Sequence, residues 1–346
     1  MSILLSIAIP TYNRSEKLLF TLNNIANQAK EIEVDKFEII VSDNCSSDNT
    51  SIILDEWIAS NVGISCKINR NESNLGYDGN CHRAIELSAG KYVWLMADDD
   101  LLLHGALHKV FTSLNVNQEF VFCFINYAVD VGGEILTSAC SVSNTEVLSS
   151  DDMIKKTNLA FSFVSSCVFN KSVWEQLNTD EYYDTAWYNL YAARDSIIRG
   201  NNLLIGEQLI HQFGLNIRER RREKNNSRIK GHEFYIGAHL RFLSLSSSME
   251  QIGYSVIAIN HVRQLGWDDN LRQIIYYKIT RDSYDFLEIS RIIFDMRPYF
   301  QFKPTFLLLH IPALLLPSSI VSKIYEAGLP IYKRIVSFRL GLIKKV

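Results

Sequence analysis

Three consecutive aspartates, Asp98, Asp99 and Asp100, are the residues of the sequence best suited to chemistry. They follow the apolar run 92–96, so a buried strand would end in three carboxylates. Adjacent carboxylates repel one another unless water or a cation compensates their charge. Hard divalent cations such as Mg²⁺ or Mn²⁺ favour carboxylate oxygens and keep water or substrate phosphate among their ligands. The triplet therefore indicates a metal site, with a solvated turn or a helix N-cap before Leu101 as the alternative.

Composition and the absence of common phosphate-binding motifs restrict the class of ligand that the chain could bind. Neither G-x-x-x-x-G-K-[ST] nor G-x-G-x-x-G occurs, so a diphosphate would be bound through the metal and not by a common phosphate loop. The net charge of −3 does not fit a nucleic-acid binder. With 47% hydrophobic residues the chain can bury a real core. The six cysteines are scattered without a C-x-x-C, which fits reduced thiols in a cytosolic protein.

Strand and helix patterns alternate in the first hundred residues and would position the aspartates. Short apolar runs predict strands at 4–9, 37–41, 66–68 and 92–96, with helical patterns between them. This alternation is typical of a mostly parallel, doubly wound α/β sheet, in which ligands sit beyond the carboxyl ends of the strands. The loops that begin at Pro10, Ser42 and Ala97 should then meet at one edge. Asn13 to Glu16 has the form of a capping box, and Gly90 that of a helix C-cap.

Four segments in one order resemble the family 2 glycosyltransferases of the GT-A fold. They are Ile7–Arg14, Ile39–Thr50, Asn74–Asn80 with its Asn-Leu-Gly-x-x-x-Asn pattern, and 90–100 with a Trp before the aspartates. The subtype is similar to bacterial abequosyltransferase-like enzymes of O-antigen assembly. The resemblance is carried by residues up to about 110 and weakens beyond about 215. It implies a Rossmann-like GT-A domain over residues 1–215, followed over 216–346 by a basic loop and a helical C-terminal region.

The resemblance also implies a nucleotide site. Its residues would be Pro10, Thr11, Tyr12, Arg14, Asp43, Asn44, Gly76, Asn80 and Asp98. The first three would line the nucleobase, with Arg14 near the phosphates. Asp43 would hydrogen-bond the base, supported by Asn44, although a cap on the following helix is an alternative role for this carboxylate.

The metal would be Mn²⁺ or Mg²⁺, held by the aspartate triplet. Ala97 stands where the family pattern Asp-x-Asp-Asp has its first aspartate. Asp99 is therefore the first choice as a ligand, together with Asp100, and Asp98 stands in for the missing carboxylate. His211, at the end of a predicted strand, would complete the metal shell, as a downstream His does in some GT-A enzymes. A structural role for this lone histidine is the alternative.

An inverting sugar transfer needs a base to deprotonate the acceptor hydroxyl. Relatives place it at a helix start after a strand like residues 163–169, but no Glu-Asp pair follows that segment here. Asp184 is the first choice for the base and Asp180 the second. The alternative is that both are ordinary loop carboxylates.

Beyond residue 215 the sequence becomes basic and then helical. Residues 218–230 hold seven cations and two acids, which suits either a solvated loop or a segment that folds over a diphosphate. Helical patterns follow from about residue 230. Residues 298–346 carry seven cationic side chains and one acidic side chain, Glu326. They combine an uncharged apolar stretch with the pattern of a basic amphipathic helix. This combination favours peripheral binding to an anionic membrane surface, with a helix docked on its own protein as the alternative.

The sequence thus predicts a metal-dependent glycosyltransferase that moves a sugar from a nucleotide-diphosphate donor to a lipid-linked saccharide acceptor in bacterial surface polysaccharide synthesis. It would lie in the cytoplasm, peripherally on the inner face of the inner membrane. Two alternatives remain. A non-catalytic module that binds a nucleotide or sugar would explain the absent Glu-Asp pair. A nucleotidyltransferase would need a Gly-rich basic loop near the N-terminus, which is lacking.

Overall fold

The structure is a computed structural model of the 346-residue chain and describes residues 2–116, 118–131, 134–212 and 245–265, together with Leu316, Ile320 and Lys323. The chain divides into two compact units, Met1–Gly214 and Leu215–Val346. The strands and α-helices of the first unit are, in chain order, β1 (Leu5–Thr11), α1 (Ser15–Ala29), β2 (Phe37–Asp43), α2 (Thr50–Ser60), β3 (Cys66–Arg70), α3 (Gly76–Glu86), β4 (Tyr92–Leu95), β5 (Leu101–Leu102), α4 (Ala106–Leu114), β6 (Phe122–Val131), β7 (Glu134–Ser138), β8 (Thr145–Leu148), α5 (Ser150–Thr157), β9 (Cys167–Asn170), α6 (Lys171–Trp174), α7 (Tyr188–Ile197) and β10 (Asn202–Gln212).

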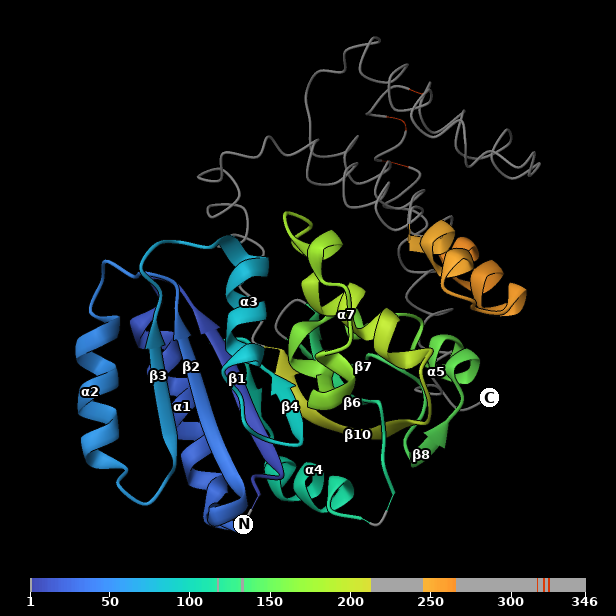
Figure 1. Cartoon of the computed structure of the whole chain (residues 1–346). Helices are drawn as coiled ribbons and strands as arrows, with labels where there is room; N and C mark the ends of the chain where they lie inside the picture. Colours follow the sequence, from blue (N-terminus) through green and yellow to red (C-terminus); the bar gives the residue numbers. More distant parts are fainter. Residues whose placement is uncertain are drawn as a thin grey trace. The chain divides into compact units, whose positions relative to one another are not determined.

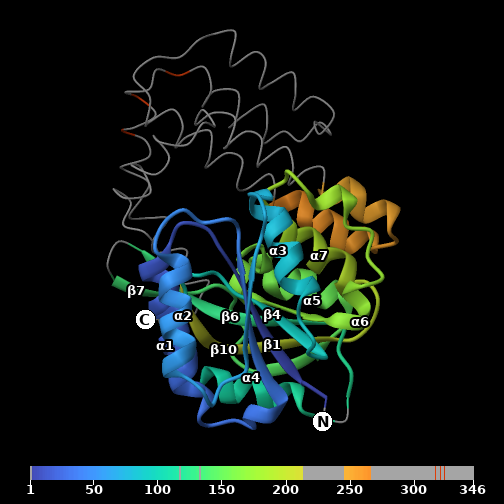
Figure 2. The ribbon, with the colours of Figure 1, turned by 60° about the vertical axis from the view of Figure 1, so that its left-hand side comes forward.

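These strands form one sheet in the order β3-β2-β1-β4-β9-β6-β10-β5, with β7 paired to β6 and β8 paired to β10. The first four strands are parallel, as the sequence predicts. The second half is mixed, because β9 lies antiparallel between β4 and β6. Helices cover both faces: α1 contacts α2 and α4, whereas α3 packs on β1, β2 and β4 and contacts α7 (Figures 1 and 2). The predicted doubly wound α/β architecture is confirmed.

The central strands are buried on both faces, as apolar runs in a covered parallel sheet should be. Every residue of β2 is buried, and Trp94 of β4 is fully buried with its indole N–H donating to the Ser165 carbonyl at 2.7 Å. β1 continues through Pro10, where the sequence predicts its end. Pairing of β1 with β4 stops at Ala8, so the proline lies beyond the ladder in which its missing N–H would be needed.

Two local predictions are wrong. Asn13 does not cap α1, whose N-cap is Arg14 without a side-chain cap bond. Asn13 instead adopts a positive φ of 54°, and its side-chain oxygen accepts the Ser47 N–H at 2.8 Å, so it fastens the loop after β2. The predicted C-cap Gly90 also has another role, because α3 ends at Glu86.

Gly90 lies where another strand comes too close for a side chain. A Cβ at this position would stand 2.6 Å from the Ser6 hydroxyl and 2.7 Å from the Ser6 nitrogen. The Gly90 N–H donates to that hydroxyl, which in turn donates to the buried Glu38 carboxylate. Glycine is needed for this close approach to β1 and not for a helix end.

β10 brings the C-terminal part of the first unit to the aspartate triplet. It runs parallel to β6, and its last residues pair antiparallel with β5, so that His211 is opposite Leu101. The predicted strand that ends near His211 is confirmed. Because His211 is opposite Leu101, it lies across from the residue that directly follows Asp100.

In the second unit, residues 245–251 and 256–265 are helical, which agrees with the helical patterns predicted from about residue 230. The basic loop 218–230 lies outside the described residues, as does the tail 298–346 except for three single positions. Within the ranges that the structure describes, no helix is long and apolar enough to cross a membrane.

Candidate nucleotide and metal site

The carboxyl ends of β1, β2 and β4 bring the predicted site residues together. The Thr11 hydroxyl, at the end of β1, donates to Asp98 Oδ2 at 2.7 Å. The Thr11 carbonyl accepts the Asn44 N–H at 2.9 Å, which joins it to the loop after β2. Pro10 and Tyr12 flank this residue, and Tyr12 is exposed. The three loops that the sequence predicts to meet at one sheet edge do meet there.

Cations of the protein itself balance the aspartate cluster. One guanidinium nitrogen of Arg14 lies 3.1 Å from Asp98 Oδ1 and 3.1 Å from Asp99 Oδ2. Lys17, one turn further along α1, has its ammonium 3.7 Å from Asp99. Burial raises the pKa of Asp98, while Arg14 and the Thr11 hydroxyl oppose that rise. Arg14 therefore lies between two carboxylates.

Asp100 has its own fixed surroundings. It is buried, and its Oδ2 accepts the Ser165 hydroxyl at 2.5 Å. The Thr21 hydroxyl lies 3.0 Å from the Asp98 carbonyl and 3.2 Å from the Asp100 carbonyl, so α1 also holds the backbone of the triplet. The alternative of a solvated turn does not hold for Asp98 and Asp100, because both carboxylates are buried and bonded within the protein.

The carboxylate oxygens of the triplet fit a hard divalent cation only if substrate supplies further ligands. No group of three or more His, Cys, Asp or Glu side chains in the described part of the chain is arranged to hold a metal. Asp98 and Asp100 are buried and accept protein hydroxyl donors, whereas Asp99, which pairs with Arg14 and Lys17, keeps 22% of its side chain exposed. Mg²⁺ and Mn²⁺ commonly take one or two carboxylates together with water and phosphate. Asp99 is the carboxylate that fits such a shared site.

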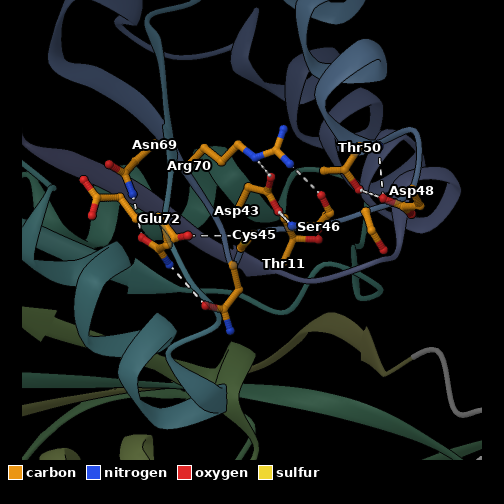
Figure 3. A network of polar contacts seen from close by, with 12 residues as sticks. Thr11, Asp43, Cys45, Ser46, Asp48, Thr50, Asn69, Arg70 and Glu72 are labelled. Carbon is orange, nitrogen blue, oxygen red and sulfur yellow. Dashed lines mark hydrogen bonds and ion pairs between the residues drawn. The ribbon is translucent and has the colours of Figure 1, made fainter.

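Asp43 ends β2 as a buried carboxylate (Figure 3). Its Oδ1 accepts the Ser46 N–H at 3.0 Å, and its Oδ2 is 3.8 Å from the Arg70 guanidinium. The same guanidinium donates to the Ser46 carbonyl at 2.7 Å. Asp43 thus shapes its own loop and does not cap the following helix, whose N-cap is Asn49. Its second oxygen lies next to a half-exposed arginine.

Arg70 is a residue of this site that the sequence analysis does not single out. It ends β3, the strand paired with β2, with Arg70 opposite Asp43 in the parallel register. Half of its side chain is exposed, so it lies between the buried carboxylate and solvent. The available signal was its position: Arg70 follows the third predicted strand, 66–68, so it should reach the same sheet edge as the other loops.

Asparagine side chains form a hydrogen-bond network that holds the loops after β2 and β3. Asn80 donates to the Ser42 carbonyl at 3.0 Å and accepts both the Ser42 hydroxyl and the Asn71 amide. Asn44 donates to the Gly76 carbonyl at 3.1 Å, and Gly76 has a positive φ of 75° that suits glycine. Asn80 and Asn44 are both buried. We call the loops after β1 and β2 the nucleotide loops, after the nucleotide contacts predicted there. The geometry of Asn80 and Asn44 fits residues that hold these loops, and a role for them in direct nucleotide contact stays a prediction.

The two candidate bases lie between α6 and α7, and both are exposed. Asp184 has a positive φ of 58°. The N–H of the next residue, Thr185, donates to Asp78 of α3 at 2.8 Å, which places Asp184 beside the helix that carries Gly76. This bond ties the residue after Asp184 to α3, and the choice of Asp184 over Asp180 as the base stays a prediction. Asp195 in α7 forms an ion pair with the neighbouring Arg194.

Comparison with known proteins agrees with this arrangement. The family model described as Glycosyl transferase family 2 matches residues 6–176, a stretch that begins in β1 and ends just after α6. Residues 6–176 form a family 2 glycosyltransferase domain. This domain contains every predicted site residue except Asp180, Asp184 and His211.

Curated relatives and solved structures extend the comparison. The chain is 31% identical over 191 residues to abequosyltransferase RfbV of Salmonella typhimurium, covering 52% of this chain and 56% of that protein. It is 31% identical over 204 residues to the GalNAc(5)-diNAcBac-PP-undecaprenol beta-1,3-glucosyltransferase of Campylobacter jejuni, covering 56% and 62%. The chain therefore spans little more than half the length of these relatives.

Two solved structures show the fold of the family 2 domain and its surroundings. TarS residues 1–349 of S. aureus, in complex with UDP-GlcNAc, superpose with a TM-score of 0.63 at 13% identity over 86% of this chain and 81% of that chain. The mannosyltransferase PcManGT of Pyrobaculum calidifontis, in complex with GDP-Man and Mn²⁺, gives 0.52 at 14% identity over 92% and 87%. The predicted GT-A fold is thereby confirmed.

Proposed function

We propose that this protein transfers a sugar from a nucleotide-diphosphate donor to a saccharide acceptor in the synthesis of a bacterial surface polysaccharide. The observation that carries the proposal is the convergence of Thr11, Arg14, Asp98 and Asp99 beside the Asp43 loop. A nucleoside would lie between Tyr12 and the Asp43 loop, and its diphosphate would meet the Arg14 guanidinium. The relatives whose names include sugar-transfer activities, at 31% identity, support the same assignment.

A bound Mn²⁺ or Mg²⁺ ion would offset the negative charge that grows on the departing diphosphate. Asp99 would hold this ion, with Asp100 and His211 as the further predicted ligands. Asp98 would instead meet the ribose, because its carboxylate is already oriented by Thr11 and Arg14. The Mn²⁺ in the PcManGT complex supports a divalent ion in a protein of this fold.

The chain's own residues would carry out the rest of the reaction. Arg14 and Lys17 would orient the diphosphate, since their cations already face the aspartate cluster. Asp184 would take the proton from the acceptor hydroxyl as its oxygen attacks the anomeric carbon and the bond to the diphosphate breaks. Such a displacement inverts the configuration at that carbon. Asp180 is the second choice for this base.

The acceptor would be a lipid-linked saccharide, and the protein would work in the cytoplasm at the inner face of the inner membrane. The Campylobacter relative carries an undecaprenol diphosphate in its name, which supports an acceptor of this class. The basic loop 218–230 and the cationic tail 298–346 supply the charge that an anionic leaflet would attract.

Thermal-shift titration tests the donor site directly. Nucleoside diphosphates of the common bases should raise the melting temperature in the presence of Mn²⁺, and an Arg14→Ala variant should lose the response because its guanidinium meets the diphosphate. A sugar-transfer assay with the stabilising donor then separates the alternatives. Binding without turnover on any acceptor would support the non-catalytic module, and release of pyrophosphate from a nucleoside triphosphate would support the nucleotidyltransferase.

A further inference from the structure

Asp78, which has none of the predicted nucleotide, metal or base roles, is a buried carboxylate that holds a loop distant from it in the chain. It lies in the first turn of α3 and is 4% exposed. Its Oδ2 accepts the N–H groups of Thr185 and Ala186, both at 2.8 Å, and its Oδ1 accepts the Tyr188 N–H at 3.0 Å. Both oxygens are therefore occupied by backbone donors from one short segment, more than a hundred residues further along the chain.

The loop that Asp78 holds has an unfavourable backbone conformation. Asp184 and Ala186 have φ angles of 58° and 59°, in the left-handed region. For residues other than glycine this costs about 1–2 kcal/mol each, and it persists only where the surroundings impose it. The hydrogen bonds to Asp78 begin directly after the first of these residues and include the second. Asp78 therefore supplies the constraint that this backbone needs.

A second anchor fixes the other end of the loop. The Tyr182 hydroxyl donates to the Asp195 carboxylate of α7, and the Thr185 hydroxyl donates to the Tyr182 carbonyl at 2.7 Å. Between the two anchors, Tyr183 and Asp184 are both exposed. The loop thus presents two side chains to solvent from a backbone that is held on both sides.

The same helix also supports the nucleotide loops. Asn80, two residues after Asp78, donates to the Ser42 carbonyl and to the Thr11 carbonyl at 3.0 and 3.3 Å. One turn of α3 therefore holds the ends of β1 and β2 through Asn80, and the loop of Asp184 through Asp78. α3 and α7 lie side by side in both views (Figures 1 and 2), and they are in contact.

We propose that Asp78 is a positioning residue that sets the place of Asp184 relative to the donor. This inference rests on the proposed function, in which Asp184 is the base. Asp78 touches neither substrate, and it acts by fixing the loop on the helix that also fixes the nucleotide loops. A misplacement of reacting groups by about 1 Å can cost about 10²-fold in rate. Loss of the anchor should therefore lower turnover without loosening the donor.

Asp78→Asn is the variant that tests this. An amide offers one acceptor oxygen where the carboxylate offers two, so at least one backbone N–H would face the amide NH₂ instead of an acceptor. We expect kcat for sugar transfer to fall by about 10- to 100-fold, while KM and Kd for the donor stay within about twofold. Hydrogen exchange of a peptide spanning residues 184–188 should become faster, which reports the anchor independently of activity.

The matched control is Ser149→Ala, which removes a side-chain cap from α5, where Ser149 accepts the Asp152 N–H. It should lower stability by about 1 kcal/mol and leave kcat unchanged. If Asp78→Asn alone does not fold, the same measurements are made with Ala186→Gly added. Glycine relieves the left-handed strain and leaves the anchor absent, so kcat should remain low.

The outcomes distinguish the two ideas. An active wild-type protein whose Asp78→Asn variant keeps its kcat, or loses donor affinity in step with kcat, overturns the positioning role alone. Exchange at residues 184–188 that does not change in that variant also overturns it. A wild-type protein with donor binding but no transfer contradicts the proposed function, and the role of Asp78 fails with it.

Discussion

The Thr11 hydroxyl donates a 2.7 Å hydrogen bond to Asp98, 87 residues further along the chain. This bond joins the end of β1 to the aspartate cluster and gives a buried carboxylate one of its few donors. The helix α1 adds Arg14 from the other side. The geometry of the candidate site thus depends on a side chain at a strand end as well as on the acidic residues themselves.

Replacing Thr11 by Val should destabilise the protein, because it removes a donor from the buried Asp98 carboxylate. We expect a loss of about 1–3 kcal/mol in the free energy of unfolding, measured by urea denaturation. Thr112→Val is the control, since Thr112 is exposed and its hydroxyl bonds only to carbonyls of its own helix. Equal losses in both variants would contradict the role of Thr11.

Replacing Asp99 by Asn should abolish metal-dependent binding of nucleoside diphosphates. Asp99 is partly exposed and pairs with Arg14 and Lys17, so its loss should change the free energy of unfolding by no more than about 1 kcal/mol. Calorimetric titration with Mn²⁺ and nucleoside diphosphate measures the effect. Asp152→Asn, at an exposed helix start elsewhere, should bind as the wild type does. Full binding by the Asp99 variant would assign the metal to other residues.

Replacing Asp184 by Asn should lower turnover by about 10²-fold or more, the usual contribution of a general base, and should spare donor binding. Asp180→Asn is the comparison, because Asp180 is exposed on the same segment. Steady-state kinetics with a saturating donor separate the two carboxylates. A large fall with Asp180→Asn and none with Asp184→Asn would reverse their order.

His82 should make stability depend on pH. Its half-buried imidazole bonds the Tyr188 hydroxyl at 3.0 Å and packs on Trp174, and burial lowers its pKa below 6.5. Glu86 opposes this effect, and Lys171 and Arg83 reinforce it. The folded state therefore favours the neutral ring.

A depressed pKa in the folded state contributes stability above pH 6.5, which is lost as the pH falls through the lowered pKa. Melting temperatures measured from about pH 7 to about pH 5 should fall less steeply for His82→Gln than for the wild type. His108→Gln, which removes an exposed imidazole, should keep the wild-type slope. Parallel curves for the wild type and His82→Gln would show that this histidine does not contribute.

Deleting residues 300–346 should move the protein from the membrane fraction to the supernatant. Each cation near an anionic leaflet contributes about 1 kcal/mol, and high salt should partly mimic the deletion because it screens this attraction. Donor binding should persist, since the predicted nucleotide residues lie before residue 110. Vesicle sedimentation with anionic and neutral lipids measures the effect, and an intact protein that sediments with neither would contradict surface binding.

The sequence was sufficient to predict the parallel half of the sheet and the meeting of its loops. The runs ending at Pro10, Ser42 and Ala97 are short and apolar, and such strands are buried on both faces of a parallel sheet. Once three of them are parallel, their carboxyl ends must lie at one edge. The burial of Thr11 and Asp98 follows from that topology and not from any local pattern.

The remaining features depend on contacts that no local pattern encodes. β9 pairs antiparallel between β4 and β6, a choice that depends on how the later strands pack. The bonds of Asp78 connect a helix start to a loop more than a hundred residues away, and its sequence context resembles an ordinary first-turn acid. Gly90 lies where the sequence suggests a helix end, yet its missing side chain is what allows the close approach to Ser6. In each case the residue or strand that determines the contact lies far away in the sequence.

The hydrogen bonds of Ser165 have a consequence for the order in which the site is completed. Its hydroxyl donates to Asp100 and accepts the Ala97 N–H, and its carbonyl accepts the Trp94 indole. During synthesis the N-terminal segments emerge first, at about 5–20 residues per second. The parallel strands and the nucleotide loops are therefore available before Ser165 leaves the ribosome. The acidic end of β4 acquires its final partners only when that later segment arrives, so in a nascent chain the loops after β1 and β2 can form before the Asp100 carboxylate is fixed.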